Sequence, residues 1–344
     1  MHHREMGYYL MIMASVVIVL AGVKSASEII VPFLLSLFIA IILSPSYNFF
    51  NKKGLPNALS LTLVITLFIV FIILIAKLIG SSAHEFSSNI EFYQQQLNIY
   101  FNKLSNFSMK MGFEIPQNEI ADMINTKEIM HFSTNIIISI SSMFTNGFVI
   151  LLTVIFMMLE SNYFLNKIEY VASNNRTKEH IEEIVDRIQE YMVLKSLISL
   201  LTAFIVWIAL IIIGTDYAFL WAVLAFILNF IPNIGSIVAA IPAVLLTLVQ
   251  LGVTSAIVVS GVYIAINVII GSVIEPKVMG KGLGLSTLVV FLSLIFWGWI
   301  FGIVGMLLSI PLTIITKIVF NANENTRAIA VFLGTGEAVE DKDK

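Results

Sequence analysis

Long apolar runs, interrupted in places by glycine and proline, dominate the pattern of this chain. Residues 217–274 contain no Asp, Glu, Lys or Arg, and neither do residues 282–316. A soluble fold cannot hide so much apolar chain without charged faces. A bilayer can, because each charged residue at its centre costs about 2.5–3.5 kcal/mol. The pattern therefore predicts an all-α polytopic membrane protein.

Six apolar stretches have roughly the 20 residues that one membrane-spanning helix needs. They are residues 8–23, 29–50, 57–79, 135–159, 191–213 and 254–274. Two further stretches, 217–251 and 286–320, are too long for one span and barely long enough for two. Each is expected to form a helix–break–helix unit, which either re-enters the membrane or crosses it twice.

The polar stretches between the spans divide the chain into six parts. These are N-terminal transmembrane helices (1–80), an extracytoplasmic helical segment (81–134), a transmembrane helix (135–159), a cytoplasmic amphipathic helical segment (160–190), a transmembrane transport core with broken helices (191–320) and a cytoplasmic tail (321–344). Lysine and arginine in short loops mark the cytoplasmic side. Arg4, Lys52 and Lys317 agree on that side, and Lys24 opposes them. Both chain ends are therefore expected in the cytoplasm.

The extracytoplasmic segment contains a heptad pattern. Its apolar residues recur at spacings of four and three, at Phe86, Ile90, Tyr93, Leu97, Tyr100, Leu104 and Phe107. Such a seam predicts a helix that buries one face. That face could pack on the chain's own membrane part or on a neighbouring subunit, and the pattern leaves both open.

Composition narrows the class of protein further. Charged residues are 12% of the 344, about half of the ~25% that is usual in a soluble domain. The net charge of −3 does not suggest nucleic-acid binding, and without cysteine there is no disulfide, thiol catalysis or cysteine metal site. No nucleotide-binding, zinc-protease or serine-hydrolase motif is present. We expect no catalytic residue, no metal and no cofactor.

The break in the stretch 217–251 is the first candidate site. It reads Asn-Phe-Ile-Pro-Asn-Ile-Gly, in which Pro232 removes a backbone donor and Gly235 permits a reversal. Asn229 and Asn233 carry amides that both donate and accept hydrogen bonds. These amides could bind a neutral, hydroxyl-rich solute, or they could only satisfy the backbone that the break frees.

Two polar residues in and after the span 254–274 form the second candidate site. Asn267 lies in the middle of the span, where its amide could bind solute or form an interhelical hydrogen bond. Glu275 lies at the membrane edge. It could act as a gate or a proton-linked carboxylate, or it could pair with Lys277 or Lys281 and anchor the loop.

Glycine and proline mark the candidate moving parts, because small residues let helices approach closely and let the backbone turn. The gating or hinge candidates are Pro276, Gly280, Gly282, Gly284, Gly298, Gly302, Gly305 and Pro311. Pro276 is expected to end the helix before it. The second break is expected between Trp297 and Gly302.

Three motifs together resemble the autoinducer-2 exporter family of bacterial membrane transporters. They are Asn-Phe-Ile-Pro-Asn-Ile-Gly at 229–235, Glu-Pro-Lys-Val-Met-Gly-Lys-Gly-Leu-Gly-Leu-Ser at 275–286 and Gly-Ile-Val-Gly-Met-Leu-Leu-Ser-Ile-Pro at 302–311. The likeness covers nearly the whole chain. It implies an inner-membrane protein that exports autoinducer-2, a small polar signal. It also implies a homo-oligomer, with a pentamer as the expected form.

The leading hypothesis is a transporter that exports a small neutral polar solute across the lipid bilayer. An uncharged path suits a neutral cargo, because a fixed charge would add a desolvation cost with no counter-charge to meet. In this hypothesis Asn229, Asn233 and Asn267 offer hydrogen bonds to the solute. A sodium or lithium/proton antiporter that uses Glu275 is the alternative. A non-transporting membrane scaffold built on the heptad seam is the third possibility.

Overall fold

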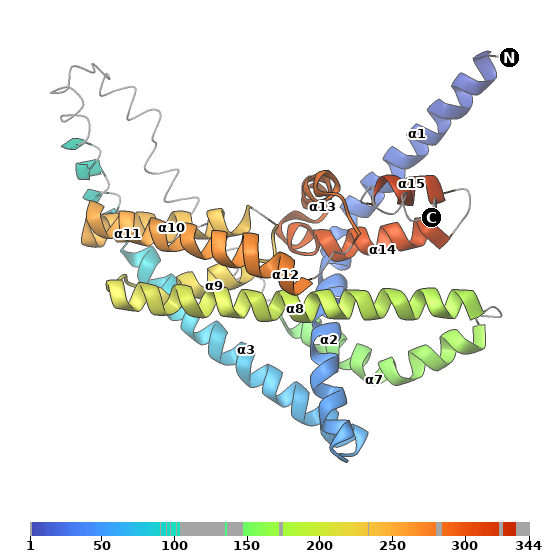
Figure 1. Cartoon of the computed structure of the whole chain (residues 1–344), viewed down its shortest axis with the longest axis horizontal. Helices are drawn as coiled ribbons and strands as arrows, with labels where there is room; N and C mark the ends of the chain where they lie inside the picture. Colours follow the sequence, from blue (N-terminus) through green and yellow to red (C-terminus); the bar gives the residue numbers. More distant parts are fainter. Residues whose placement is uncertain are drawn as a thin grey trace. The chain divides into compact units, whose positions relative to one another are not determined.

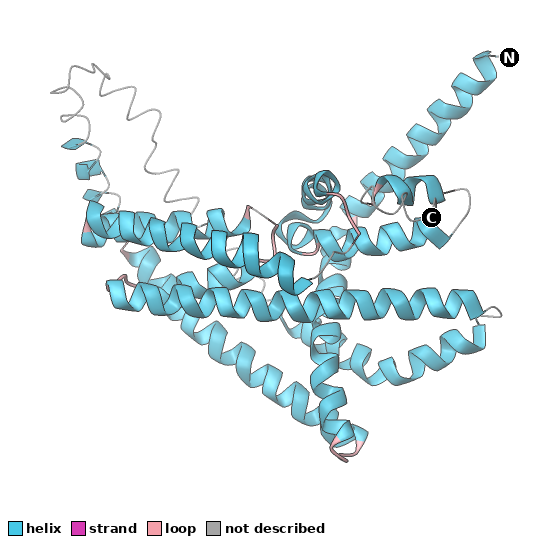
Figure 2. Cartoon of the chain, in the orientation of Figure 1, coloured by secondary structure: helices cyan, strands magenta, loops and turns pink. Residues whose placement is uncertain are grey.

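The structure is a computed structural model of the whole chain (Figure 1). It describes residues 2–89, 91–93, 95–96, 98–100, 102–103, 135, 147–171, 175–232, 234–279, 284–322 and 326–334. Over these ranges the chain is helical and has no strand (Figure 2). One isolated β-bridge joins Leu285 and Gly334. The prediction of an all-α fold is confirmed.

The helices take their bounds from the apolar runs and from the glycines and prolines between them. In chain order they are α1 (His2–Ser25), α2 (Ser27–Lys52), α3 (Asn57–Ser88), α7 (Gly147–Val171), α8 (Asn175–Ile213), α9 (Ala218–Leu228), α10 (Gly235–Leu251), α11 (Val253–Ile266), the π-helix η1 (Asn267–Ile274), α12 (Glu275–Met279), α13 (Thr287–Leu307), α14 (Ser309–Ala322) and α15 (Arg327–Phe332).

Among the described residues, five helical segments are long and apolar enough to cross a membrane. They are Ser27–Lys52, Asn57–Phe86, Val185–Ile213, Val253–Val278 and Thr287–Leu307. The first four coincide with predicted spans. The predicted span 8–23 corresponds to the shorter apolar helix Leu10–Ser25, and the described part of the predicted span 135–159 to Gly147–Glu160. The chain is therefore a multi-pass membrane protein.

The chain forms two compact units. Unit 1 consists of Met1–Val64, Phe148–Leu194 and Met279–Lys344, and unit 2 of Ile65–Gly147 and Lys195–Val278. In unit 1, α13 packs against α1, α2 and α14, and α14 packs against α15. In unit 2, α10 packs against α9 and α11, and α10 and α11 lie side by side in Figure 1.

The predicted break in 217–251 separates α9 from α10. The two helices have 11 and 17 residues, so at about 1.5 Å per residue both are shorter than the ~30 Å apolar core of a bilayer. Gly235, the first residue of α10, lies directly against the backbone of Leu228, and a Cβ at this position would overlap the Leu228 carbonyl oxygen. The tight reversal therefore requires glycine.

The predicted break in 286–320 lies inside α13 and again before α14. Gly302 has φ 64° and ψ −145°, a conformation that interrupts the helix and favours glycine. A Cβ at Gly305 would overlap the carbonyl oxygen of Trp297. At its start α13 is capped by Ser286, whose hydroxyl accepts a hydrogen bond from the Val289 amide at 3.2 Å. The helix–break–helix prediction is confirmed for both stretches.

The first part of the heptad seam packs on its own chain, in unit 2. Phe86 and Tyr93 are 2% and 5% exposed, and their rings stack with centroids 5.6 Å apart. Phe86 also meets the rings of Tyr217 and Trp221 edge to face. Burial and the hydrogen bond with Tyr217 raise the pKa of Tyr93 above its ordinary value. The seam residues outside the described ranges are Ile90, Leu97, Leu104 and Phe107.

The described C-terminal segment is held within unit 1. The amide of Ser286 donates a hydrogen bond of 3.3 Å to the carbonyl of Leu333, beside the bridge between Leu285 and Gly334. Ala330 of α15 is 2% exposed. The end of α15 is therefore fixed to the residues that lead into α13.

Candidate functional site

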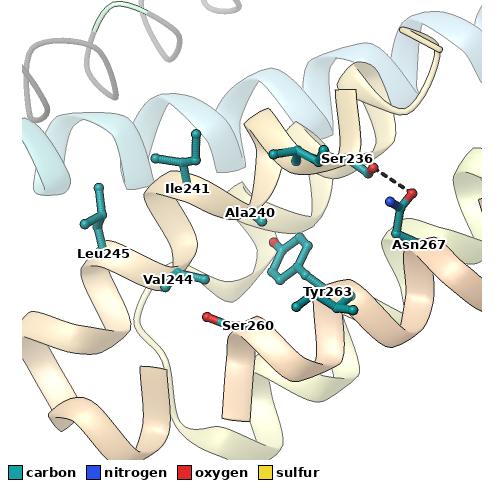
Figure 3. Close-up of a pocket in the computed structure, with 10 residues that line it drawn as sticks. Ser236, Ala240, Ile241, Val244, Leu245, Ser260, Tyr263 and Asn267 are labelled. Carbon is teal, nitrogen blue, oxygen red and sulfur yellow. Dashed lines mark hydrogen bonds between the residues drawn. The ribbon is translucent and has the colours of Figure 1, made fainter. Parts of the chain in front are cut away.

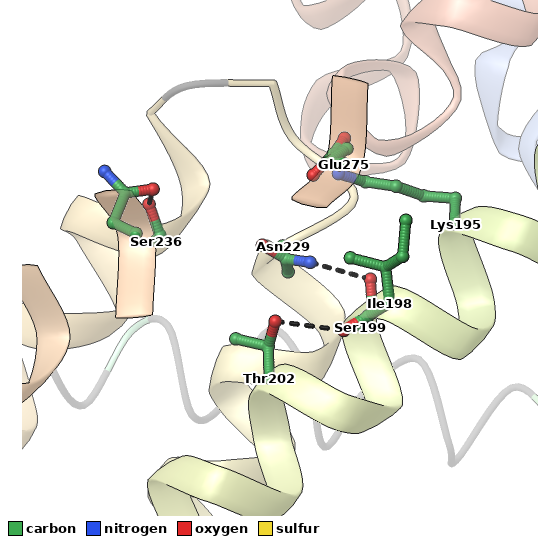
Figure 4. Close-up of polar contacts among 8 residues, drawn as sticks. Lys195, Ile198, Ser199, Thr202, Asn229, Ser236 and Glu275 are labelled. Carbon is green, nitrogen blue, oxygen red and sulfur yellow. Dashed lines mark hydrogen bonds and ion pairs between the residues drawn. The ribbon is translucent and has the colours of Figure 1, made fainter. Parts of the chain in front are cut away.

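A stripe of buried polar side chains runs along one face of α8 in unit 2 (Figure 4). Lys195, Ser199 and Thr202 recur at i, i+4 and i+7 and are at most 5% exposed. Thr202 bonds back to the carbonyl of Ile198 in its own helix, at 2.9 Å. Lys195 and Ser199 instead contact side chains outside α8. The stripe therefore links α8 to two other polar side chains of unit 2.

Ser199 contacts the first break through Asn229. The Asn229 amide nitrogen donates a hydrogen bond of 2.9 Å to the Ser199 hydroxyl (Figure 4). Asn229 follows the last residue of α9 and is half-buried. Its amide thus does more than satisfy the backbone of the break: it joins the break to α8.

Lys195 contacts Glu275 through a buried ion pair. The two charged atoms, Lys195 Nζ and a Glu275 carboxylate oxygen, are 2.5 Å apart. The Lys195 side chain is 4% exposed and that of Glu275 is 22% exposed. The structure therefore pairs Glu275 with α8 rather than with Lys277, and Lys281, the other partner expected from the sequence, lies outside the described residues.

Glu275 follows a π-helix, which the sequence did not reveal. The eight residues of η1 continue α11, and α12 continues η1 up to Met279. The expectation that Pro276 ends its helix was wrong. Pro276 is the second residue of α12, and the helical run passes through it, as α2 passes through Pro32 and Pro45.

Asn267 is the first residue of η1 and bonds to α10. Its amide oxygen accepts a hydrogen bond of 2.8 Å from the hydroxyl of Ser236 (Figure 3). Both residues are half-buried. Gly271 lies beside the same amide, because a Cβ on it would be 3.1 Å from the Asn267 amide oxygen.

The Ser236–Asn267 pair lies in the wall of a cavity between α10 and α11 (Figure 3). The cavity has a volume of about 340 Å³, and none of its ten lining residues is charged. Most of the wall is apolar. Ser260 and Tyr263 also line it, but the Ser260 hydroxyl donates to the carbonyl of Ala256 in its own helix, and the Tyr263 hydroxyl is buried.

Tyr263 has a buried hydroxyl. The residue is 6% exposed, and no described residue forms a hydrogen bond with its oxygen. A buried hydroxyl left in this state costs about 1–3 kcal/mol. Lys195, Ser199, Ser236 and Tyr263 were not among the candidates from sequence, although the i, i+4, i+7 stripe on α8 was a usable signal.

The remaining candidates of the first break and the loop after α12 are only partly described. Pro232 is half-buried in the turn, and its carbonyl accepts a hydrogen bond of 2.6 Å from the Ile234 amide. Gly284 has φ +62°, and its carbonyl accepts a hydrogen bond from Lys317 Nζ. Three candidates, Asn233, Gly280 and Gly282, lie outside the described residues.

The candidates of the second break belong to unit 1. Trp297 donates a hydrogen bond of 3.0 Å to the Thr313 hydroxyl and stacks on Phe301. Gly298 faces Met306, and Pro311 is buried in α14. These residues lie in a packed hairpin. Among the described residues of the chain, no group of three His, Asp or Glu side chains could hold a metal ion.

Several apolar helices with polar residues at their breaks are the architecture of a membrane transporter. The chain belongs to the AI-2E family of transporters, because the model of that family, described as AI-2E family transporter, matches residues 10–325.

Individual relatives match over similar lengths. The chain is 39% identical to the AI-2 transport protein TqsA of Escherichia coli K12 over 318 residues, which are 92% of each protein. It is 42% identical over 331 residues to a putative transport protein of Haemophilus influenzae, covering 94% of this chain and 95% of the relative. It is 32% identical over 330 residues to the putative transport protein YhhT of E. coli K12, covering 96% and 95%.

Proposed function

We propose that this transporter exports autoinducer-2 (AI-2), a small neutral polar solute, from the cell. The name of the relative TqsA supports this solute, and the uncharged wall of the cavity suits a neutral cargo. The observation that carries the proposal is the hydrogen bond between Ser236 and Asn267. A hydroxyl and an amide can exchange such a bond for bonds to a hydroxylated solute.

The predicted residues divide into two roles under this proposal. Asn229, Asn233 and Asn267 offer hydrogen bonds along the path, and Glu275 lies at its end. Movement of the two breaks is assigned to the glycines and prolines, namely Pro232, Gly235, Pro276, Gly280, Gly282, Gly284, Gly298, Gly302, Gly305 and Pro311.

Efflux of labelled AI-2 from proteoliposomes tests the proposal. Asn267→Ala and Ser236→Ala are each expected to slow efflux by roughly tenfold, because each removes one hydrogen-bonding group. Thr153→Val is the control, because the Thr153 hydroxyl bonds to the Val149 carbonyl of its own helix in unit 1, away from the cavity. A wild-type protein that does not move AI-2, or wild-type rates in both site variants, would contradict the proposal.

A cation/proton antiporter is the second candidate function. The observation that favours it is a carboxylate, Glu275, in the membrane span Val253–Val278. The Lys195 ammonium weighs against it, since a cation would have to displace this partner. Sodium and proton fluxes measured in the same vesicles decide between the two. The antiporter requires a flux that follows the titration of a carboxylate and disappears in Glu275→Gln at matched expression.

We also propose that the protein lies in the bacterial inner membrane, with both ends cytoplasmic, as a homo-oligomer with five copies. The positions of lysine and arginine and the family resemblance support this arrangement. The chain has no cysteine, so single cysteines at positions 3 and 344 can be labelled cleanly. Labelling from the cytoplasmic face alone is expected. The protein mass of the solubilised complex, without bound detergent, should be five times 38.2 kDa. A complex that moves neither AI-2 nor ions would favour the scaffold instead.

A further inference from the structure

The π-helix η1 is held by a polar side-chain contact at each end. Its first residue, Asn267, accepts a hydrogen bond from Ser236 of α10. The residue directly after its last one, Glu275, pairs with Lys195 of α8. Well under 1% of residues in proteins lie in π-helices, and such turns are frequent at functional sites. All four contacting residues belong to unit 2.

The geometry of a π-helix links the two contacts. Its amides bond to the carbonyl five residues back, whereas an α-helix uses the carbonyl four residues back. A change of register by one residue therefore rotates everything after it by about 100°, the angle per residue of an α-helix. Because Glu275 directly follows η1, such a change would move its carboxylate relative to Asn267.

We propose that η1 couples solute binding at Asn267 to the Lys195–Glu275 ion pair. Solute hydroxyls replace Ser236 as the partner of the Asn267 amide, η1 changes register, and Glu275 leaves Lys195. Release of the solute reverses these steps. The proposal rests on the proposed function in one respect, namely that the solute binds at Asn267.

In this coupling, Gly271 is a positioning residue for the Asn267 amide. A Cβ on Gly271 would be 3.1 Å from the Asn267 amide oxygen, so the glycine leaves that oxygen room to bond to Ser236 or to a solute. Gly261 lies in the same membrane span, in the helix α11 that precedes η1. A Cβ there would meet nothing within 4 Å. The two glycines thus form a matched pair for substitution.

The first experiment compares Gly271→Ala with Gly261→Ala in AI-2 efflux from proteoliposomes. Both changes exchange a helical glycine for alanine, which favours the helix, so both proteins are expected to fold. Gly271→Ala is expected to raise KM for AI-2 by about three- to tenfold, the effect of weakening one hydrogen bond, with a smaller change in the maximal rate. Gly261→Ala should keep the wild-type KM. An unchanged KM in Gly271→Ala overturns the role of Gly271.

The second experiment needs no solute. The double variant Lys195→Met/Glu275→Gln removes the ion pair without leaving a lone buried charge. Hydrogen exchange of the amides of η1 is expected to become faster in this variant, by about tenfold or more, while exchange in α10 stays as in the wild type. Unchanged exchange in η1 overturns the coupling even if AI-2 is transported. Faster exchange in a protein that does not transport AI-2 refutes the proposed solute and supports the coupling.

Discussion

Lys195 and Glu275 bring opposite charges into a buried part of unit 2 whose other polar side chains are uncharged. The pair is buried on the lysine side, where only 4% of the side chain is exposed. Taking one ion out of water costs several kcal/mol, and only a close partner offsets that cost. The burial of each charge therefore depends on the other. A single substitution changes stability in two ways, because it removes the contact and also leaves the remaining charge without its partner.

Lys195→Met is expected to destabilise the protein by about 3–5 kcal/mol, because it strands the Glu275 carboxylate. The double variant Lys195→Met/Glu275→Gln is expected to regain most of this loss. Thermal unfolding in detergent, followed by size-exclusion chromatography, measures both. Equal stability of the single and the double variant would show that the pair is not a unit.

For the Tyr263 hydroxyl, which bonds to no described residue, a substitution is expected to raise the stability of the protein rather than lower it. Tyr263→Phe removes a buried hydroxyl that bonds to no described residue, so the free energy of unfolding should rise by about 1 kcal/mol. Tyr93→Phe is the matched control, because the Tyr93 hydroxyl is bonded to Tyr217 and its loss should lower stability by a similar amount. Melting temperatures of the two variants in the same detergent give the comparison. A lower melting temperature for Tyr263→Phe would mean that its hydroxyl has a partner.

At the residue scale the sequence pointed to some site residues and missed others. Asn229 and Asn267 stand out because amides are rare in apolar spans, and the structure gives each a side-chain partner. Their partners, Ser199 and Ser236, are small hydroxyls that occur throughout membrane helices, so nothing local distinguishes them. The partner of Glu275 is 80 residues away in the chain, and only the fold brings Lys195 to it.

Two hairpins of short helices are the elements that most distinguish this chain. Each turns at a glycine that lies against a backbone carbonyl, at Gly235 and Gly305. Backbone cannot move aside as a flexible side chain can, so these reversals admit no Cβ without a shift of the helix. The hairpins follow directly from the spacing of Pro and Gly in charge-free runs, which is why they were predictable.

Gly235→Ala is expected to destabilise the protein by about 2 kcal/mol or more and to reduce the yield of folded protein, because overpacking against backbone forces α9 and α10 apart. Gly80→Ala in α3 is the control, since a Cβ there would meet nothing within 4 Å. Yield and melting temperature of the two variants, purified in parallel, provide the measurement. Wild-type stability in Gly235→Ala would mean that the reversal is looser than the structure has it.

The π-helix could not be predicted at the scale of elements. Its eight residues are as apolar as those of α11, and a π-helix differs from an α-helix by one residue of register, which an apolar pattern does not record. Pro276 was misleading for a related reason. The helical run passes through Pro276 where η1 gives way to α12, as α2 passes through Pro32 and Pro45.

At the scale of the whole molecule, the chain builds each unit from segments that are far apart in sequence. Unit 1 combines the N-terminal helices, a segment from the middle of the chain and the C-terminal segment from Met279, while unit 2 takes the two segments between them. The sequence gives the spans but not this division, because apolar pattern identifies helices and says nothing of which helices pack together. The described end of the chain, up to Gly334, is part of unit 1.

Truncation after Thr326 removes α15 and the contacts of Leu333 and Gly334 with residues 285 and 286. These contacts together contribute about 1 kcal/mol, so their loss is expected to lower the melting temperature by about 2–4 °C. Truncation after Gly336 keeps these contacts and should melt like the full chain. Thermal unfolding of the three proteins in one detergent gives the result. Identical melting of the shorter truncation and the full chain would show that α15 adds nothing to unit 1.

The bridge between Leu285 and Gly334 also determines where the protein can safely be modified for laboratory work. An affinity tag or fluorescent reporter inserted just before residue 334 would move Gly334 away from Leu285 and so break the bridge. Fusions should therefore begin after Gly336, so that the bridge and the end of α15 stay intact.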